Sequence, residues 1–279
     1  RVFPIKEVSD IGRKHNIPLI MDNTAAPIIC KPIEHGAAVV VHSLTKFIGG
    51  HGTVIGGCLV DGGNFDWTAN PKRQPLFNEP DMSYGGAKWG EVVPQLTGAN
   101  VAFAVRARVC LLRDLGAPLS PDNAWGIIQG LETAPLRMKQ HCSNAEKVVS
   151  FLQKHKNVDR VIYPTLHEGE IAARSKKYFK GGNGALVGIE VKGGVEAGKK
   201  FIEALKMFYH VANIGDARSL AIHPATTTHS QLTEEELLAA GVTPGYVRLS
   251  IGIEHPDDII ADLDQALGAS GKPNLKAVS

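Results

Sequence analysis

The chain has 279 residues and carries 30 Lys and Arg against 28 Asp and Glu, which leaves a formal charge of +2. So small a net charge argues against nucleic acid or an anionic membrane as the main partner. The 43% hydrophobic and 21% charged residues are ordinary for a globular protein and exclude disorder, collagen and coiled coil. No apolar run approaches the roughly 20 residues of a membrane span, and no signal-peptide pattern opens the chain.

The four cysteines lie far apart and form no CxxC pair: Cys30, Cys58, Cys110 and Cys142. In a chain of this length an even cysteine count is poor support for disulfides. We therefore expect free thiols, packed as small hydrophobic side chains, in a cytoplasmic protein.

The first third of the chain alternates helical and strand patterns. An amphipathic helix is predicted over residues 5–15, and short apolar strands over 18–21, 37–42 and 54–60. This alternation predicts an α/β sheet of mostly parallel strands, whose ligands bind outside the carboxyl ends of the strands. Asp22 and Lys46 both follow such an end.

Residues 64–90 lose this period and predict a long ordered surface segment, after which a helix is expected over 90–115. Gly116, Ala117 and Pro118 break that helix, and we place a domain boundary there. The expected organisation is a large domain over residues 1–118 and a smaller C-terminal domain over 119–279.

The second domain is expected to be α+β. Ser120 starts a predicted pair of long helical stretches that run to about Lys156. Further strands are predicted over 158–163, 185–191 and 246–253, and further helices over 195–208 and 256–267.

Lys46 is the first candidate for chemistry, because two hydroxyl residues, Ser43 and Thr45, stand just before it at the end of a strand. Taken alone, most such lysines are solvated loop residues. Asp22 changes this balance: an aldehyde cofactor such as pyridoxal phosphate needs a lysine amine for its Schiff base and an anion beside its pyridine nitrogen. Ser43 and Thr45 then suit a phosphate.

Two other ligand classes are not favoured. The glycine run over residues 49–57 is followed by an apolar strand, whereas a dinucleotide fingerprint opens a helix. The histidine pairs His42/His51 and His223/His229 do not have the spacing of a common metal-ligand pair, so no metal is expected.

Several long motifs resemble the Cys/Met-metabolism family of pyridoxal-phosphate enzymes, and the likeness covers residues 1 to about 267. They are Met21–Thr24, Val41–Gly52 and Val247–Glu254, joined by Asn78–Tyr84, Asn123–Trp125, Gly130–Thr133 and Thr228–Leu232, which are most similar to the O-acetylhomoserine sulfhydrylase branch. The resemblance implies a fold-type I, aminotransferase-like architecture with pyridoxal 5'-phosphate as cofactor.

The resemblance also implies residue roles. Lys46 would form the Schiff base and shuttle protons between the substrate's Cα and Cγ, Asp22 would pair with the pyridinium, and Ser43 and Thr45 would bind the phosphate. Arg248 would clamp the substrate carboxylate, with the backbone or side chain of Asn213 assisting. Without the resemblance, Arg248 is more simply a strand arginine in a surface ion pair.

The implied reaction is a γ-replacement that converts O-acetyl-L-homoserine and sulfide to L-homocysteine and acetate. Cystathionine γ-synthase and methionine γ-lyase are rival activities on the same cofactor residues. A non-catalytic, truncated chain that serves as a scaffold is a rival of another kind. Sites completed by a neighbouring subunit in the family imply a homo-oligomer, a dimer or tetramer.

Family members carry a longer N-terminal portion, which supplies a ring-stacking aromatic residue and phosphate-binding N–H groups. The chain starts at Arg1-Val2-Phe3-Pro4, without an initiator Met, and we expect it to start inside the fold. On that expectation the 279-residue polypeptide by itself would bind the cofactor weakly, be inactive and tend to aggregate.

Overall fold

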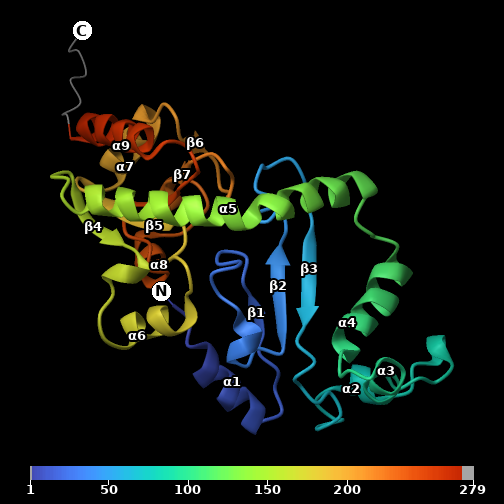
Figure 1. Cartoon of the computed structure of the whole chain (residues 1–279). Coiled ribbons are helices and arrows are strands. Elements are labelled where there is room, and N and C mark those ends of the chain that lie inside the picture. Colours follow the sequence, from blue (N-terminus) through green and yellow to red (C-terminus); the bar gives the residue numbers. More distant parts are fainter. Residues whose placement is uncertain (1, 272–279) are drawn as a thin grey trace.

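The computed structural model describes residues 2–271 as two β-sheets with one long helix running past both (Figure 1). The first sheet has the order β1-β2-β3, with β1 (Ile20–Asp22), β2 (Val39–Ser43) and β3 (Gly57–Asp61). The second sheet has the order β4-β5-β8-β7-β6, with β4 (Val158–Ile162), β5 (Leu186–Val191), β6 (Tyr209–His210), β7 (Leu220–Ile222) and β8 (Tyr246–Ser250). Every strand predicted from the sequence is present in the fold.

In the first sheet β1 and β2 are parallel, with Asp22 opposite Val41, and β3 returns antiparallel to β2. The parallel pair brings the carboxyl ends of β1 and β2 to the same edge. In the second sheet β5 and β8 form an antiparallel centre between β4 and β7, while the short β6 pairs parallel with β7. These mixed sheets, covered by helices, give the α/β architecture that the sequence predicts.

The other helices flank the two sheets (Figure 1). They are α1 (Ile5–Lys14), α2 (Pro75–Asn78), α3 (Trp89–Thr97), α4 (Ala102–Arg106), α6 (Gly169–Tyr178), α7 (Gly194–Ala204), α8 (Glu234–Ala239) and α9 (Pro256–Ser270). Short 3-10 turns lie at Pro32–His35, Met82–Tyr84, Pro164–Leu166 and Pro224–Thr226, and a π-helical stretch at Ala107–Arg113 extends α4.

Two helix predictions need correction. The pair of stretches expected up to Lys156 is one helix, α5 (Pro121–Leu152), which begins where the Ser120 hydroxyl accepts a bond from Asn123 N–H and contains Pro135 in its interior. The single helix expected over 90–115 is divided, because Gly98 ends α3 in a left-handed conformation at φ +70°. Helices α6 and α8 and strands β6 and β7 were not predicted.

The main hydrophobic core lies between the second sheet and helices α5, α7 and α9. Its fully buried members include Val187, Ile189, Leu249, Phe201 and Leu263. A second cluster, rich in aromatic rings, packs α2, α3 and α4 against one edge of the first sheet through Phe65, Trp67, Phe77 and Trp89. The two clusters leave the carboxyl ends of β1 and β2 between them. The boundary expected at residue 118 stays a prediction, since α5 contacts the second sheet and also the turn that follows β2.

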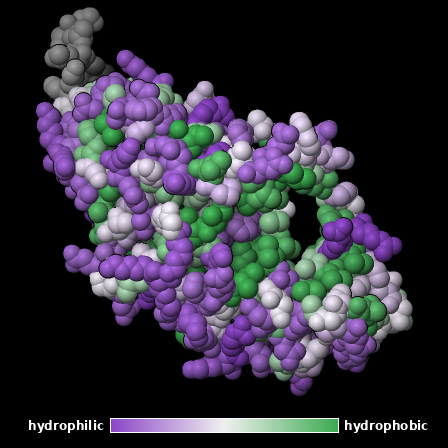
Figure 2. Space-filling view, in the orientation of Figure 1, coloured by the Kyte–Doolittle hydropathy of each residue, from purple (hydrophilic) through white to green (hydrophobic). Residues whose placement is uncertain are grey.

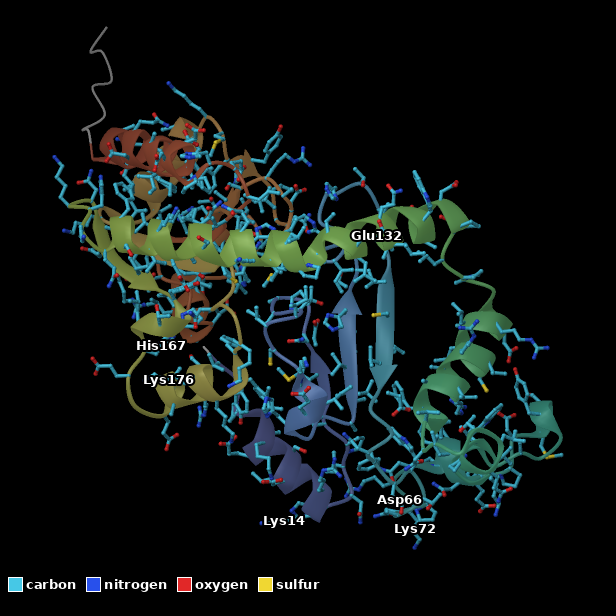
Figure 3. The ribbon with its side chains drawn as sticks, viewed as in Figure 1. Lys14, Asp66, Lys72, Glu132, His167 and Lys176 are labelled. Carbon is cyan, nitrogen blue, oxygen red and sulfur yellow. The ribbon has the colours of Figure 1, made fainter. Side chains whose placement is uncertain are left out.

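Charged side chains cover the periphery, and apolar ones gather over the first sheet. In Figure 3, Lys14, Asp66, Lys72 and Lys176 extend outward from the ribbon. Figure 2 shows apolar residues over β2 and β3, where Ile55, Leu59 and Val60 are exposed. Within the described part of the chain, no helix is long and apolar enough to cross a membrane.

The packing of α5 on the turn after β2 depends on Gly130. A Cβ there would lie 2.4 Å from the carbonyl oxygen of Gly49. We expect Gly130→Ala to lower the free energy of unfolding by about 1–3 kcal/mol, the usual cost of overpacking. Gly268→Ala is the matched control, because it lies in α9 with open space around it; it should raise stability by about 0.5–1 kcal/mol. Urea unfolding measures both, and equal effects would show that the close contact carries no energy.

Candidate active site

Lys46 lies in a tight turn that directly follows β2. We call residues 43–50 the lysine turn. Gly49 N–H donates to Leu44 O over 2.7 Å, and Gly50 N–H donates to Lys46 O over 2.7 Å. Gly50 adopts φ +72°, a left-handed conformation that favours glycine. These bonds fix the backbone of Lys46 at the end of the strand, on the side that faces α5 (Figure 1).

Asn213 joins two of the predicted site residues. Its side-chain oxygen Oδ1 accepts a hydrogen bond from Lys46 Nζ, and its backbone oxygen accepts one from Arg248 Nη2 over 3.2 Å. The sequence left open whether the backbone or the side chain of Asn213 contributes. In the fold both do, toward different partners, and together they bring the amine and the guanidinium into one place.

Asp22 and Ser43 stand at the neighbouring carboxyl ends of β1 and β2. Thr24 connects them: its N–H donates to Asp22 Oδ1 over 2.8 Å, and its hydroxyl accepts from Ser43 N–H over 2.8 Å. No partner of Asp22 Oδ2 or of the Ser43 hydroxyl is found among residues 2–271. One carboxylate oxygen and one hydroxyl therefore stay available to a ligand.

Thr45 differs from Ser43, because its hydroxyl bonds the start of the next strand. It accepts from Gly56 N–H over 3.1 Å and makes a longer contact of 3.4 Å to Gly56 O. Donation to a phosphate would exchange this longer contact for a charge-assisted bond.

Arg248 sits on β8 between Val247 and Leu249, which are both fully buried. Burial lowers the pKa of Arg248. Its bond to Asn213 is the only hydrogen bond found for this guanidinium within the described residues. The side chain lines a cavity of about 270 Å³, together with Ala25, Ala26 and Tyr163. The surface ion pair expected for Arg248 without the family resemblance is therefore not found among residues 2–271. The guanidinium is open to an anionic group.

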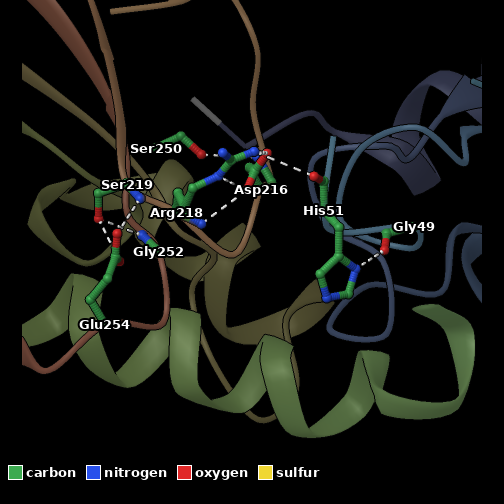
Figure 4. A network of polar contacts seen from close by, with 9 residues as sticks. Gly49, His51, Asp216, Arg218, Ser219, Ser250, Gly252 and Glu254 are labelled. Carbon is green, nitrogen blue, oxygen red and sulfur yellow. Dashed lines mark hydrogen bonds and ion pairs between the residues drawn. The ribbon is translucent and has the colours of Figure 1, made fainter. Parts of the chain in front are cut away.

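The segment that follows Asn213 is anchored on the second sheet. Figure 4 shows part of this network, with Asp216, Arg218 and Ser250. Gly215 N–H donates to the Ser250 hydroxyl over 3.0 Å, and Ala217 N–H donates to Gly50 O of the lysine turn over 2.8 Å. Asp216 forms an ion pair with Arg218 at 3.1 Å. These contacts hold Asn213 in register with Lys46.

Sequence reasoning missed the face of α5 that meets the lysine turn. Arg137 donates to Phe47 O and Ile48 O, and the ring of His141 packs edge-on against Phe47 at 5.3 Å between centroids. Both residues fall in the buried stripe of α5 with Ala134, Met138 and Ala145. The sequence signal that could have identified this face is a charged residue, Arg137, at a helix position where the spacing predicts an apolar one.

Other candidates have simpler places in the fold. All four cysteines are free, and burial raises the pKa of Cys30 to about 11. His223 bonds Thr226 and Pro244 O at 2.9 Å each. Among residues 2–271, no group of three or more His, Cys, Asp or Glu could hold a metal ion.

Comparison with known proteins finds a family and close relatives. Residues 1–268 match the family model for Cys/Met metabolism PLP-dependent enzymes. An O-acetyl-L-homoserine sulfhydrylase of Leptospira meyeri is 54% identical over 94% of this chain and 60% of its own length. A homocysteine synthase of Schizosaccharomyces pombe is 45% identical over 94% of this chain. The chain spans about 60% of the length of these curated relatives.

A solved structure agrees with the sequence matches. The crystal structure of a candidate O-acetylhomoserine (thiol)-lyase from Campylobacter jejuni superposes with a TM-score of 0.87 and 42% identity. It covers 96% of this chain and 63% of its own, and it contains a pyridoxyl-lysine phosphate. The fold-type I architecture expected from the sequence is thereby confirmed.

His141 should make stability depend on pH. The residue is fully buried, and burial lowers its pKa to about 4, whereas an unfolded chain keeps the ordinary pKa of about 6.5. Between these values the unfolded state binds a proton that the folded state does not, so stability falls as the pH drops from about 6.5 to 4. The full difference is about 3 kcal/mol.

Urea unfolding from pH 7 to pH 4 tests this expectation. The stability advantage of the parent over His141→Gln should shrink steadily across the window, because only the parent carries the titrating group. His15→Gln, at an exposed histidine, is the control and should follow the parent throughout. A constant difference between parent and His141→Gln would contradict the assignment.

Proposed function

We propose that this chain, which belongs to the family of Cys/Met metabolism PLP-dependent enzymes, carries the cofactor lysine and the substrate clamp of an O-acetylhomoserine sulfhydrylase. The reaction is a γ-replacement that converts O-acetyl-L-homoserine and sulfide to L-homocysteine and acetate. The observation that carries the proposal is the meeting of Lys46 and Arg248 at Asn213. Relatives named as sulfhydrylases and homocysteine synthases support it.

The residues present fit pyridoxal 5'-phosphate. The Lys46 amine is bound by a neutral amide oxygen, and no carboxylate pairs with it in the described part of the chain. Asp22 offers an unbonded carboxylate oxygen at the adjacent strand end, and Ser43 an unbonded hydroxyl. These three groups match the cofactor: the amine suits its aldehyde, the carboxylate its pyridine nitrogen and the hydroxyl its phosphate.

When bound, the cofactor supplies an aldehyde for a lysine amine and a protonated ring that withdraws electrons from the substrate's Cα. Lys46 would hold the aldehyde carbon, Asp22 would keep the ring nitrogen protonated, and Ser43 and Thr45 would bind the phosphate. Thr45 would give up its longer contact with Gly56 O for this purpose.

Arg248 would hold the substrate carboxylate. A half-buried guanidinium with unused donors favours a bidentate carboxylate, and the Asn213 carbonyl fixes the orientation of the guanidinium. The carboxylate then lies near Lys46, because Asn213 contacts both side chains. From that position Nζ of Lys46 can take the protons from Cα and Cβ and return them to these carbons after sulfide has replaced acetate at Cγ.

We also propose a homo-oligomer, a dimer or tetramer, that works in the cytoplasm on small-molecule substrates. Association is supported by exposed apolar side chains: Trp125, Leu131 and Leu136 on α5, and Ile55 just before β3. The four free thiols support a reducing compartment.

Borohydride reduction of the PLP-loaded protein tests the role of Lys46. The reduced pyridoxyl group should map by peptide mass to Lys46, because no ion pair of its amine is found among residues 2–271 and its turn follows β2, the strand that pairs with the one ending in Asp22. Lys46→Ala should remove the label, while Lys31→Ala, at an exposed lysine paired with Glu34, should retain it. A label on another lysine would contradict the proposal.

Arg248→Lys tests the clamp. A lysine cannot reproduce the planar fork, and loss of a charge-assisted bond costs about 1.5–3 kcal/mol, so KM for O-acetylhomoserine should rise roughly 10–150-fold while cofactor content stays unchanged. Arg160→Lys, on β4 in an exposed ion pair with Glu190, is the control. The assay is homocysteine formation from O-acetylhomoserine and sulfide, with cysteine as nucleophile and methionine as substrate offered separately. An unchanged KM in Arg248→Lys would place the clamp elsewhere, and a preference for cysteine or methionine would favour a different enzyme of the family.

A further inference from the structure

Arg137 is a buried cation without an acidic partner. Only 6% of the residue is exposed, and no carboxylate contacts it among residues 2–271. Burial lowers its pKa. A charge placed this way is costly unless strong hydrogen bonds replace its water. The hydrogen-bond partners of Arg137 therefore have to compensate for the lost hydration of its charge.

Each hydrogen bond found for the Arg137 guanidinium among residues 2–271 goes to an oxygen of the protein. Nη1 donates to Phe47 O over 2.7 Å, and Nη2 donates to Ile48 O over 2.8 Å. On its own helix, Nη2 also donates to Gly130 O over 2.6 Å, and Nε donates to the Thr133 hydroxyl over 3.1 Å. Phe47 and Ile48 are the two residues that directly follow Lys46.

Two glycines make room for this contact. A Cβ on Gly50 would lie 2.0 Å from Arg137 Nη1, and one on Gly130 would lie 2.4 Å from Gly49 O. The backbone of the lysine turn therefore approaches α5 more closely than any side chain would allow. The close approach of Arg137 and the turn therefore requires glycine on both sides, Gly50 in the turn and Gly130 in α5.

The lysine turn is also bound on its other side. Gly50 O accepts from Ala217 N–H over 2.8 Å, and Phe47 lies between the backbone of Gly215 and the ring of His141. The turn is thus fixed between α5 and the segment that carries Asn213. If Arg137 releases the carbonyls of Phe47 and Ile48, one of the two supports of Lys46 is lost.

We propose that Arg137 is a positioning residue that holds the backbone after Lys46 so that the lysine amine meets Asn213 and the reacting atoms. The proposal rests on the proposed function of Lys46. It predicts that loss of the Arg137 fork leaves Lys46 able to bind the cofactor but places its amine poorly for proton transfer, so that kcat falls more than KM changes.

Two variants and a control separate this role from a general contribution to stability. Arg137→Met removes the donors at similar length, and Arg137→Lys keeps the charge without the fork. Met138→Ala is the control, because the neighbouring Met138 is 2% exposed and lies in the main core, and no hydrogen bond from it to the lysine turn is found among residues 2–271. If Arg137→Met does not fold, Arg137→Lys gives the same comparison.

The first measurement is amide hydrogen exchange in the whole protein before PLP is added. The N–H of Gly50, which bonds Lys46 O, should exchange at least roughly tenfold faster in the Arg137 variants than in Met138→Ala, relative to amides of the second sheet. Equal exchange in all three variants would overturn the proposal, since the turn would then be held without Arg137.

The second measurement uses the PLP-loaded protein. In Arg137→Met we expect kcat to fall by roughly 10–100-fold with KM nearly constant, and the pH titration of the cofactor absorbance to shift, while Arg137→Lys recovers part of the loss. Met138→Ala should keep the titration of the parent. A parent-like kcat and titration in Arg137→Met would reduce the residue to a stabilising role. Failure of the proposed function itself is a separate result, visible as borohydride labelling of a lysine other than Lys46.

Discussion

The position of the lysine turn between α5 and the segment around Asn213 is the constraint on which the rest of the site depends. Neither support is close in sequence: Asn213 lies 167 residues from Lys46, and Arg137 lies 90 residues from Phe47. The two sheets form separate cores, so the turn is placed by hydrogen bonds across the gap between them rather than by hydrophobic packing alone. Such bonds are directional, which suits an amine that must meet its partner within a fraction of an ångström.

Two arginines, the buried Arg137 and the half-buried Arg248, show how the same residue type serves different purposes. Burial lowers the pKa of both Arg137 and Arg248, and neither has a carboxylate partner in the described residues. Arg137 satisfies its donors with three carbonyls and a hydroxyl, so it has little left to offer a ligand. Within the described part of the chain Arg248 makes a single side-chain hydrogen bond, to Asn213 O, and the residue lines a cavity. A half-buried guanidinium with unused donors has a desolvation cost that a bound carboxylate can offset, whereas a buried guanidinium with all its partners stabilises the backbone around it.

Local patterns sufficed to predict the strand ends and the residues on them. Asp22 and Lys46 were identified because apolar strands ended in front of them, and the parallel pairing of β1 and β2 confirms that these ends are neighbours. The role of Arg137 was not predictable in the same way, because its partners are backbone carbonyls, which look the same at every residue. Thr45 shows a further limit: its hydroxyl bonds the backbone of Gly56, a contact that the spacing of hydroxyl residues does not reveal.

Asn213 fixes the distance between the Lys46 amine and the Arg248 guanidinium, which lie far apart in the sequence. Its side-chain oxygen meets Lys46 and its carbonyl oxygen meets Arg248, so the separation between amine and guanidinium is set within a single residue. The carbonyl contact does not depend on the side chain, while the amide contact does. A residue of another type at this position would keep the orientation of Arg248 and lose the partner of Lys46. An α-amino acid has its carboxylate one bond from Cα, and a fixed separation of amine and guanidinium is therefore the geometry that the proposed transfer of the Cα proton to Nζ requires.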